Sequence, residues 1–417
     1  MTAPASPRDD DAGVRRAGPG RLSLALMDAR NQTLALLARW REAQDAAHVQ
    51  VPCEPGFELP QWIAGHVAWF AESWIGRNPR RGQGRACPPD TPRLPSVLPM
   101  ADRWYHPLQA PHASRWDMPL PSLDEVRGYL LETLEQTLEL LEHAAPDDDG
   151  LYFFRAALLH EDLRAEQLLR QAQALGLRIG PPMPPASVAR EPLQVPACRW
   201  VLGAVDAGFA FDVERGPHEE PVPEFEIDAQ PVGWGQFVEF VDDGGYDRPE
   251  LWHPQGWEWL TALAAGEGRR GPRHVDQIGV ASGAVMQTLF GWPTRMASQQ
   301  PVMHVTWWEA DAWCRWAGRR LPTELEWEVA AMRAASRGFR WGDVHEWTAG
   351  TLRPWPGFTP DPWARYGDLA AEPMFGRARV LRGTSFATRP RLGWPTRRGF
   401  ALPEDDRGFV GFRSCAP

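Results

Sequence analysis

The chain has 417 residues, of which 43% are hydrophobic and 24% are charged, a composition typical of a soluble globular protein with two or three domains. The formal net charge is −10 and every one of the 44 basic residues is arginine, which argues against a nucleic-acid or anionic-membrane surface and excludes chemistry that needs a lysine. No apolar run approaches the roughly 20 residues of a membrane-spanning helix, and the first residues lack the apolar core of a secretory signal, so we expect a cytoplasmic protein.

The first half of the chain predicts a helical bundle behind a flexible segment of residues 1–20. Apolar residues recur there at three- and four-residue spacing, as they do on the buried face of an amphipathic helix. Ser122 and Glu125 have the spacing of a capping box at the start of the third helix, and the acidic residues 147–150 are expected to separate the third helix from the fourth. Four helices are expected, at residues 21–47, 59–75, 122–141 and 151–175. We therefore assign a four-helix bundle to residues 21–175.

The second half has a different pattern. Residues 176–196 are rich in Pro and Gly and are assigned as a linker. Beyond the linker, helical periodicity is mostly lost, and helices are expected only at residues 235–242, 308–317 and 324–333. Short strand-like segments are expected at residues 201–206, 225–232 and 379–386. Residues 197–417 therefore predict a loop-rich α+β domain, and the whole chain an α+β protein.

Two histidines stand in the middle of bundle helices, His66 in the second and His160 in the fourth. Helical bundles place metal sites on inward-facing side chains of neighbouring helices. Either residue alone is more simply a buried structural histidine, whereas the two together favour a metal site. A third ligand is expected one turn beyond His160, but Arg164 stands there and a permanent cation cannot bind a metal. From these residues alone the site is incomplete, and both interpretations stay open.

Several motifs in both halves of the chain resemble one enzyme family. The segments QWIAGHVAWF (61–70), SRWDMPLPS (114–122) and HEDLRAE (160–166) resemble the DinB-like bundle of ergothioneine-type sulfoxide synthases. The second half resembles the formylglycine-generating-enzyme or sulfatase-modifying fold, which is C-type-lectin-like. The segments that carry this second resemblance are PVMHVTWWEADAWCRWAGRRLPTELEWEVAA (301–331), HEWTAG (345–350), VLRGTSFAT (380–388) and FVGFRSC (409–415). Within the family, GHVAWF and the ending ALPEDDRGFVGFRSCA are more similar to the selenoneine synthase branch.

The resemblance implies a non-heme iron oxidoreductase with Fe(II) as its cofactor. Such an enzyme uses O₂ to join the imidazole C2 of hercynine, which is trimethylhistidine, to sulfur or to the selenium of a selenosugar. The leading expectation is carbon–selenium bond formation in selenoneine biosynthesis, in an active site between the two domains. Two alternatives stay open, a sulfoxide synthase that takes a thiol donor and a non-catalytic homologue that binds a betaine-like ligand. The sequence has no pattern that specifies an oligomeric state.

The same resemblance implies roles for particular residues. His66 and His160 fall on iron ligands, Arg164 falls on the third histidine of the family, and Glu166 falls on a carboxylate that supports the ligands. Three explanations for Arg164 are open: a two-histidine iron site, a carboxylate from elsewhere as third ligand, or loss of the metal with the arginine binding an anion. Glu161 is poorly directed for the second explanation, since it lies about 100° around the helix from His160.

The remaining assignments concern the second domain. The paired tyrosines of the sulfoxide synthases fall on Trp363 and Tyr366, which are therefore the candidate catalytic residues. The resemblance places substrate-binding residues at four further positions, Asp212, Glu214, Arg398 and Phe400. His345 lies in a motif typical of the fold, where we expect a hydrogen-bonded structural role.

Overall fold

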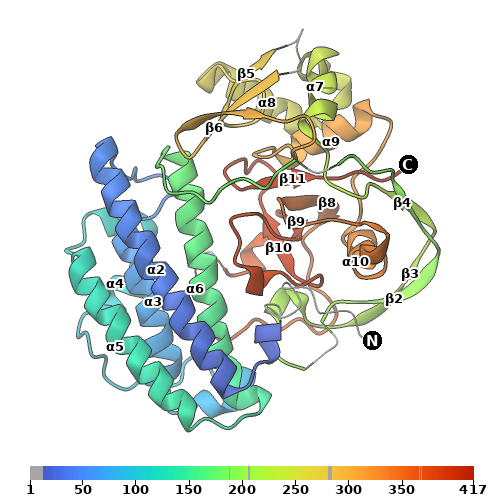
Figure 1. Cartoon of the computed structure of the whole chain (residues 1–417). Helices are drawn as coiled ribbons and strands as arrows, with labels where there is room; N and C mark the ends of the chain where they lie inside the picture. The colour runs from blue at the N-terminus through green and yellow to red at the C-terminus, as the bar shows by residue number, and fades with distance from the viewer. Residues whose placement is uncertain (1–12, 187, 205–206, 280–283, 366, 368) are drawn as a thin grey trace.

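The computed structural model of the protein describes residues 13–186, 188–204, 207–279, 284–365, 367 and 369–417. A helical first half is followed by a second half of small sheets and short helices, which confirms the predicted α+β class (Figure 1). None of the described helices is long and apolar enough to span a membrane. The helices of the first half are α2 (Pro19–Ala47), α3 (Pro60–Ala71), α4 (Ala101–Tyr105), α5 (Leu123–Glu142) and α6 (Asp148–Ala174).

The starts of α5 and α6 are set by side-chain caps. Ser122 forms the predicted capping box, in which Glu125 N donates to Ser122 Oγ at 3.3 Å and Ser122 N donates to Glu125 Oε2 at 2.8 Å. At the next helix, Asp147 Oδ1 accepts from Gly150 N at 2.7 Å and α6 begins at Asp148. The expected break at residues 147–150 is therefore wrong beyond Asp147. Acidic residues in a first turn stabilise a helix through its dipole rather than interrupt it.

The chain enters the bundle earlier than the sequence predicts. Residues 1–12 of the expected flexible segment lie outside the described residues, whereas Gly13–Arg16 forms a 3₁₀ turn in which Val14 is buried. Residues 13–20 therefore belong to the folded bundle. Helix α3 continues into a π-helical turn over Glu72–Gly76, so the second helix reaches the predicted end of its segment.

The described residues of the second domain form four small sheets. One has the strand order β10-β9-β8-β11, with β8 and β11 parallel and the other pairs antiparallel. Its strands are β8 (His345–Thr351), β9 (Arg379–Arg382), β10 (Arg398–Ala401) and β11 (Val410–Phe412). The others are the antiparallel sheet of β5 (Val275–Gly279), β6 (Ala284–Leu289) and β7 (Trp292–Met296), the pair of β1 (Leu193–Val195) with β4 (Phe225–Ile227), and the pair of β2 (Cys198–Leu202) with β3 (His218–Val222).

Four α-helices are present in the described part of this domain, and one of them contradicts the prediction. They are α7 (Trp234–Asp242), α8 (Pro254–Glu267), α9 (Trp307–Trp316) and α10 (Glu324–Arg333). The sequence analysis missed α8, because this helix buries only Gly256 and Leu260 and so has no apolar stripe. It also missed the β5–β7 sheet, in which Gln287 takes an inward position of β6 and hides the alternation of apolar residues.

The expected strands of the second domain are longer than those observed. The segment 225–232 is extended only over β4, and the segment 379–386 only over β9. In the segment 201–206, the first two residues end β2, while 205–206 lie outside the described residues. The described residues of these three segments that lie outside the strands form turns and loops, as expected for a loop-rich domain.

Helix α6 joins the two domains. One cluster of buried apolar side chains runs from the bundle into the second domain, and Figure 1 shows α6 on the side of the bundle that faces the four-stranded sheet. Arg391 binds Asp162 of α6 with contacts of 2.5 and 3.0 Å. Near the helix end, Gln173 Nε2 donates to Thr288 O at 2.8 Å and Phe290 N donates to Gln173 Oε1 at 2.6 Å. The face of α6 that carries Asp162 and Gln173 therefore meets the second domain, while His160 faces the bundle interior.

Candidate active site

His66 is held in a fixed orientation by the backbone of α4. Its Nδ1 donates to Tyr105 O at 2.9 Å, so the neutral ring carries its lone pair on Nε2. The close approach of α4 depends on Gly65, because a Cβ at that position would lie 2.1 Å from the Tyr105 ring. Trp62 and Trp69 stack on the imidazole with ring centroids 4.8 and 5.4 Å away. This support resembles the backbone hydrogen bonds that orient metal-binding histidines.

His160 faces His66 across the bundle, with ring centroids 5.1 Å apart and planes at 63°. The side chain is 1% exposed, and Phe70 stacks on it at 3.9 Å. Burial is the main reason that the pKa of His160 lies well below its usual range, and the Arg164 charge lowers it further. The ring is therefore neutral, and the structure brings the two predicted histidines together.

Arg164 occupies the place next to His160 where a further ligand was expected. Its Nε donates to His160 Nε2 at 3.2 Å, and its Nη1 donates to Gln167 Oε1 at 2.8 Å. The proton of the neutral His160 ring is then on Nδ1, which has no hydrogen-bond partner among the described residues. The guanidinium thus occupies the lone pair of His160 Nε2.

The donor set does not fit a three-ligand iron site. The carboxylate of Glu161 is bound to Arg30 at 2.9 and 3.1 Å, and that of Asp162 to Arg391, so neither supplies a third ligand beside His160. Within the described ranges, no group of three or more His, Cys, Asp and Glu side chains could hold a metal ion. Two imidazoles remain, one of them engaged by a cation. We therefore derive no step through iron.

Glu166 connects α6 to the second domain. Its Oε1 lies 2.7 Å from His345 Nε2, and Ser385 Oγ donates to the same oxygen at 3.4 Å. Burial alone would raise the pKa of Glu166, but His345 and the Arg397 guanidinium lower it to about 2. The expected hydrogen-bonded histidine at 345 thus has an ionised carboxylate of the other domain as its partner, which its sequence motif does not reveal.

Trp363 lies one aromatic ring away from His160. It meets the edge of Phe70 with centroids 5.5 Å apart, and Phe70 stacks on the imidazole. The indole Nε1 donates to the hydroxyl of Tyr152 at 3.0 Å, and this hydroxyl donates to Asp361 Oδ1 at 2.5 Å. The second candidate catalytic residue, Tyr366, lies outside the described residues. Tyr152 of α6 was missed, because its partners are more than 200 residues away, as with the separation of 209 to Asp361.

Glu214 is fully buried beside the aromatic residues of the interface. Its carboxylate accepts hydrogen bonds from the backbone N–H groups of Phe211 and Arg398, both at 3.2 Å, and from Trp394 Nε1 at 3.3 Å. Burial is the main reason that its pKa is raised to about 7. Glu214, a predicted substrate-binding residue, therefore holds the first residue of β10 and the indole of Trp394 through one carboxylate.

Asp212 locks the loop that carries Trp363. Its backbone N–H donates to Asp361 Oδ2 at 3.1 Å, and Asp361 N donates back to Asp212 Oδ2 at 3.3 Å. Burial and then the Asp361 charge raise the pKa of Asp212 to about 7. Arg215 Nη1 donates to Asp361 Oδ1 at 2.6 Å, so the ionised member of the pair is Asp361.

The other two predicted substrate-binding residues make contacts inside the second domain. Arg398 binds Glu324 with Nε and Nη2 at 2.8 and 2.9 Å and lies 4.3 Å from the Trp355 ring. Phe400 packs on the small apolar cluster that contains Val380. These contacts hold the second domain together and do not involve the bundle.

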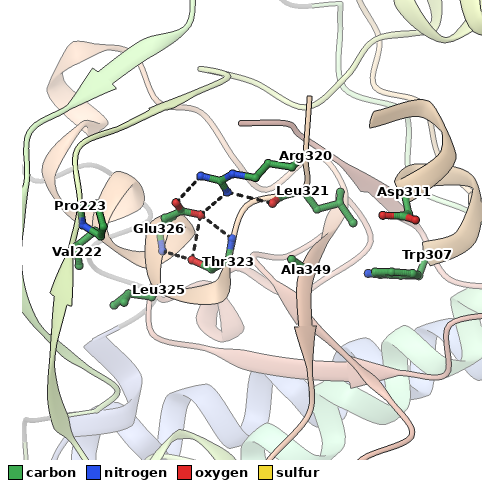
Figure 2. Close-up of a pocket in the computed structure, with 10 residues that line it drawn as sticks. All are labelled: Val222, Pro223, Trp307, Asp311, Arg320, Leu321, Thr323, Leu325, Glu326 and Ala349. Atoms are coloured by element: carbon green, nitrogen blue, oxygen red, sulfur yellow. Dashed lines mark hydrogen bonds and ion pairs between the residues drawn. The ribbon is translucent and has the colours of Figure 1, made fainter. Parts of the chain in front are cut away.

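A separate cavity of about 470 Å³ lies in the second domain and contains none of the predicted site residues. Figure 2 shows Arg320 beside it, bound to Glu326, which also caps α10 through Thr323. Trp307 and Asp311 lie on its far side. The histidine pair is therefore not part of this cavity.

The two halves match two family models. Residues 21–185 match the DinB superfamily, and residues 185–343 match the sulfatase-modifying factor enzyme 1-like domain. The chain is 32% identical to the hercynine oxygenase of Mycolicibacterium smegmatis, over 92% of this chain and 96% of that protein. It is 30% identical to the hercynine oxygenase of Mycobacterium tuberculosis, over 95% of this chain and 98% of that protein. The chain belongs to the hercynine oxygenase family.

Membership of the hercynine oxygenase family confirms the resemblance on which the sequence analysis depends. The formylglycine-generating enzyme of Mus musculus is 30% identical over a shorter part, 45% of this chain and 52% of that protein. This match is partial, whereas the hercynine oxygenases match over more than nine tenths of the chain. The combination of bundle and second domain is what this chain shares with the hercynine oxygenases along nearly all of its length.

Proposed function

We propose that this protein acts on hercynine in an O₂-dependent reaction that joins the imidazole C2 to the selenium of a selenosugar. The observation that carries the proposal is the His66–His160 pair, with centroids 5.1 Å apart, at the domain interface of a hercynine oxygenase family member. In the balanced reaction, the C2–H and Se–H bonds break and the C2–Se bond forms. One O₂ takes the four electrons released when selenium is also oxidised, leaving one oxygen on selenium and one in water.

The aromatic residues of the interface suit the trimethylammonium group of hercynine. Phe211 lies between Trp363 and Trp394, with centroids 6.2 and 6.0 Å away, and Phe70 connects Trp363 to His160. Aromatic faces attract quaternary ammonium groups through the ring quadrupole. A betaine placed along this row would have its cation against indole rings and its imidazole near the two histidines.

A neutral sugar donor agrees with the arginines near the bundle site. Arg77 is bound to Asp102 through two hydrogen bonds of 2.8 and 2.7 Å, and Arg115 is bound to Glu58 and stacks on Trp62. Neither arginine is available to hold the carboxylates of γ-glutamylcysteine without breaking a partly buried ion pair. This favours the selenosugar over the thiol donor of the sulfoxide synthases.

A second candidate function is metal-free binding of a betaine-like ligand. The specific observation in its favour is the hydrogen bond from Arg164 Nε to His160 Nε2 at 3.2 Å, which occupies a nitrogen that iron would need. A binder of this kind would keep the aromatic row and the domain interface while losing the oxidation chemistry.

Two measurements on the purified protein separate the candidates. Anaerobic titration with Fe(II), followed by O₂ uptake in the presence of hercynine and selenosugar, tests the oxygenase. Stoichiometric iron binding with hercynine-dependent O₂ uptake supports it, and the absence of both rejects it. Calorimetry with hercynine in chelator-treated buffer tests the binder, which requires an affinity that iron does not change.

A further inference from the structure

Arg397, just before β10, has a buried guanidinium that the protein does not pair. The side chain is 9% exposed, and Nη1 is buried without a hydrogen-bond partner. Within the part of the chain that the structure describes, its side chain forms no hydrogen bond and no ion pair. Its neighbour Arg398, by contrast, is held by Glu324 through two hydrogen bonds. Sequence reasoning chose Arg398 for substrate binding and missed the arginine beside it.

Two carboxylates lie near Arg397, but each is engaged elsewhere. Glu166 and Glu214 both favour the charged guanidinium electrostatically. Glu166 Oε1 is bound to His345, and Glu214 accepts hydrogen bonds from three N–H groups. Neither carboxylate forms a hydrogen bond with the Arg397 side chain. An arginine side chain stays protonated in proteins, and leaving a buried charge without a hydrogen-bonded partner is costly. Arg397 Nη1 therefore has negative charge nearby but no hydrogen-bonded acceptor, and a ligand carboxylate could supply one.

The position of Arg397 suits a ligand that also reaches the histidine pair. Glu166 is six residues beyond His160 on α6, which corresponds to about 9 Å along the helix axis and about 120° around it. On the other side, Glu214 holds the indole of Trp394, which belongs to the aromatic row. An amino-acid betaine bound to the Arg397 guanidinium could extend from there toward His160.

We propose that Arg397 binds the carboxylate of the amino-acid betaine, with the trimethylammonium group on the aromatic row and the imidazole toward His160. This role rests on the proposed function and adds to it the residue that recognises the acid group. A guanidinium binds a carboxylate through charge-assisted and often bidentate hydrogen bonds, which are stronger than neutral ones. The ligand thereby satisfies the buried cation that the protein leaves unpaired.

The test compares hercynine with its decarboxylated analogue, Nα,Nα,Nα-trimethylhistamine, by calorimetry on the full chain. The unmodified protein should bind hercynine about 10- to 100-fold more tightly, as expected for one charge-assisted contact. Arg397→Gln should bind the two ligands equally, within about threefold, and Arg397→Lys should keep part of the preference. Arg377→Gln, which removes an exposed arginine of the same domain, is the matched control and should leave the preference unchanged.

Thermal unfolding with each ligand gives an independent readout. Hercynine should raise the Tm of the unmodified protein by more than the decarboxylated analogue does, and Arg397→Gln should abolish this difference, whereas an arginine with a purely structural role would leave it unchanged. A preference for hercynine that survives in Arg397→Gln overturns the proposal.

The outcomes also separate this inference from the proposed function. If the unmodified protein binds hercynine and the analogue equally, Arg397 is not the anchor while hercynine remains the substrate. If it binds γ-glutamylcysteine through Arg397 and does not bind hercynine, the carboxylate anchor stands and the proposed substrate fails. Binding of none of the three ligands overturns both.

Discussion

Replacing Arg164 with histidine would supply the third donor that the sequence resemblance predicts at this position. The two existing imidazoles already face each other, and His66 is oriented by its hydrogen bond to Tyr105 O. Arg164 sits one helical turn from His160, so a histidine at this position projects from the same face of α6. The Arg164→His variant should therefore complete a three-histidine set without moving the backbone.

The expected gain in iron affinity follows from charge and distance. A metal on His160 Nε2 would lie about 2 Å from that nitrogen, in the direction where Arg164 Nε now sits at 3.2 Å. Even with the guanidinium moved to about 5 Å, a unit charge repels a dication by roughly 1.7 kcal/mol in water and by about 7 kcal/mol at an effective dielectric constant of 20. Taking the smaller value alone, the dissociation constant for Fe(II) should fall by at least about 15-fold.

Anaerobic calorimetry with Fe(II) on the unmodified protein, Arg164→His and Arg164→Gln measures this effect. The glutamine variant removes the charge without supplying an imidazole, so its affinity should lie between the other two. Equal affinities for Arg164→His and the unmodified protein would refute the reasoning, because the two native histidines would then not share a metal-binding geometry.

Three further predictions concern the domain interface. Glu166→Gln should lower the free energy of unfolding, measured in urea at pH 7, by about 3 kcal/mol. Because the pKa of Glu166 is lowered in the folded protein, this stabilisation is present above about pH 4.5 and is lost as the pH falls toward 2. An equal loss of stability at pH 3 would contradict the pairing with His345. Because the pKa of Asp212 is raised from 3.8 to about 7, the unmodified protein loses stability as the pH rises through this range. The stability of Asp212→Asn relative to the unmodified protein should therefore increase by up to about 4 kcal/mol between pH 4 and pH 8 in the same assay. A difference that does not change with pH would refute this role of Asp212. Tyr152→Phe should lose about 1–3 kcal/mol in urea unfolding, because Asp361 loses a buried donor; unchanged stability would contradict that role.

Local patterns in the sequence predicted the bundle and the two histidines well. The capping residues of α5 and the apolar spacing act within a few residues, so they can be read without knowledge of the fold. Helix α8 was not predicted, because its few buried positions form no apolar pattern that the sequence shows locally.

The partners of the site residues were not predictable in this way. Glu166 and His345 are 179 residues apart in the chain and meet only when α6 docks on the second domain. The sequence also places Arg164 one turn from His160 without saying whether its guanidinium turns toward the ring or toward solvent. Only the folded structure, in which Arg164 is buried and donates to His160, decides this. Between Arg397 and Arg398 the choice likewise depends on where Glu324 lies.

The mass of the product formed under O₂ tests the proposed function most directly. The protein, supplied with Fe(II), is incubated with hercynine and with selenosugar and γ-glutamylcysteine in competition, and the products are analysed by mass spectrometry. We expect an O₂-dependent product that contains hercynine and carries the isotope pattern of selenium. A sulfur-containing adduct would contradict the selenium donor, and recovery of unchanged hercynine would contradict the oxygenase altogether.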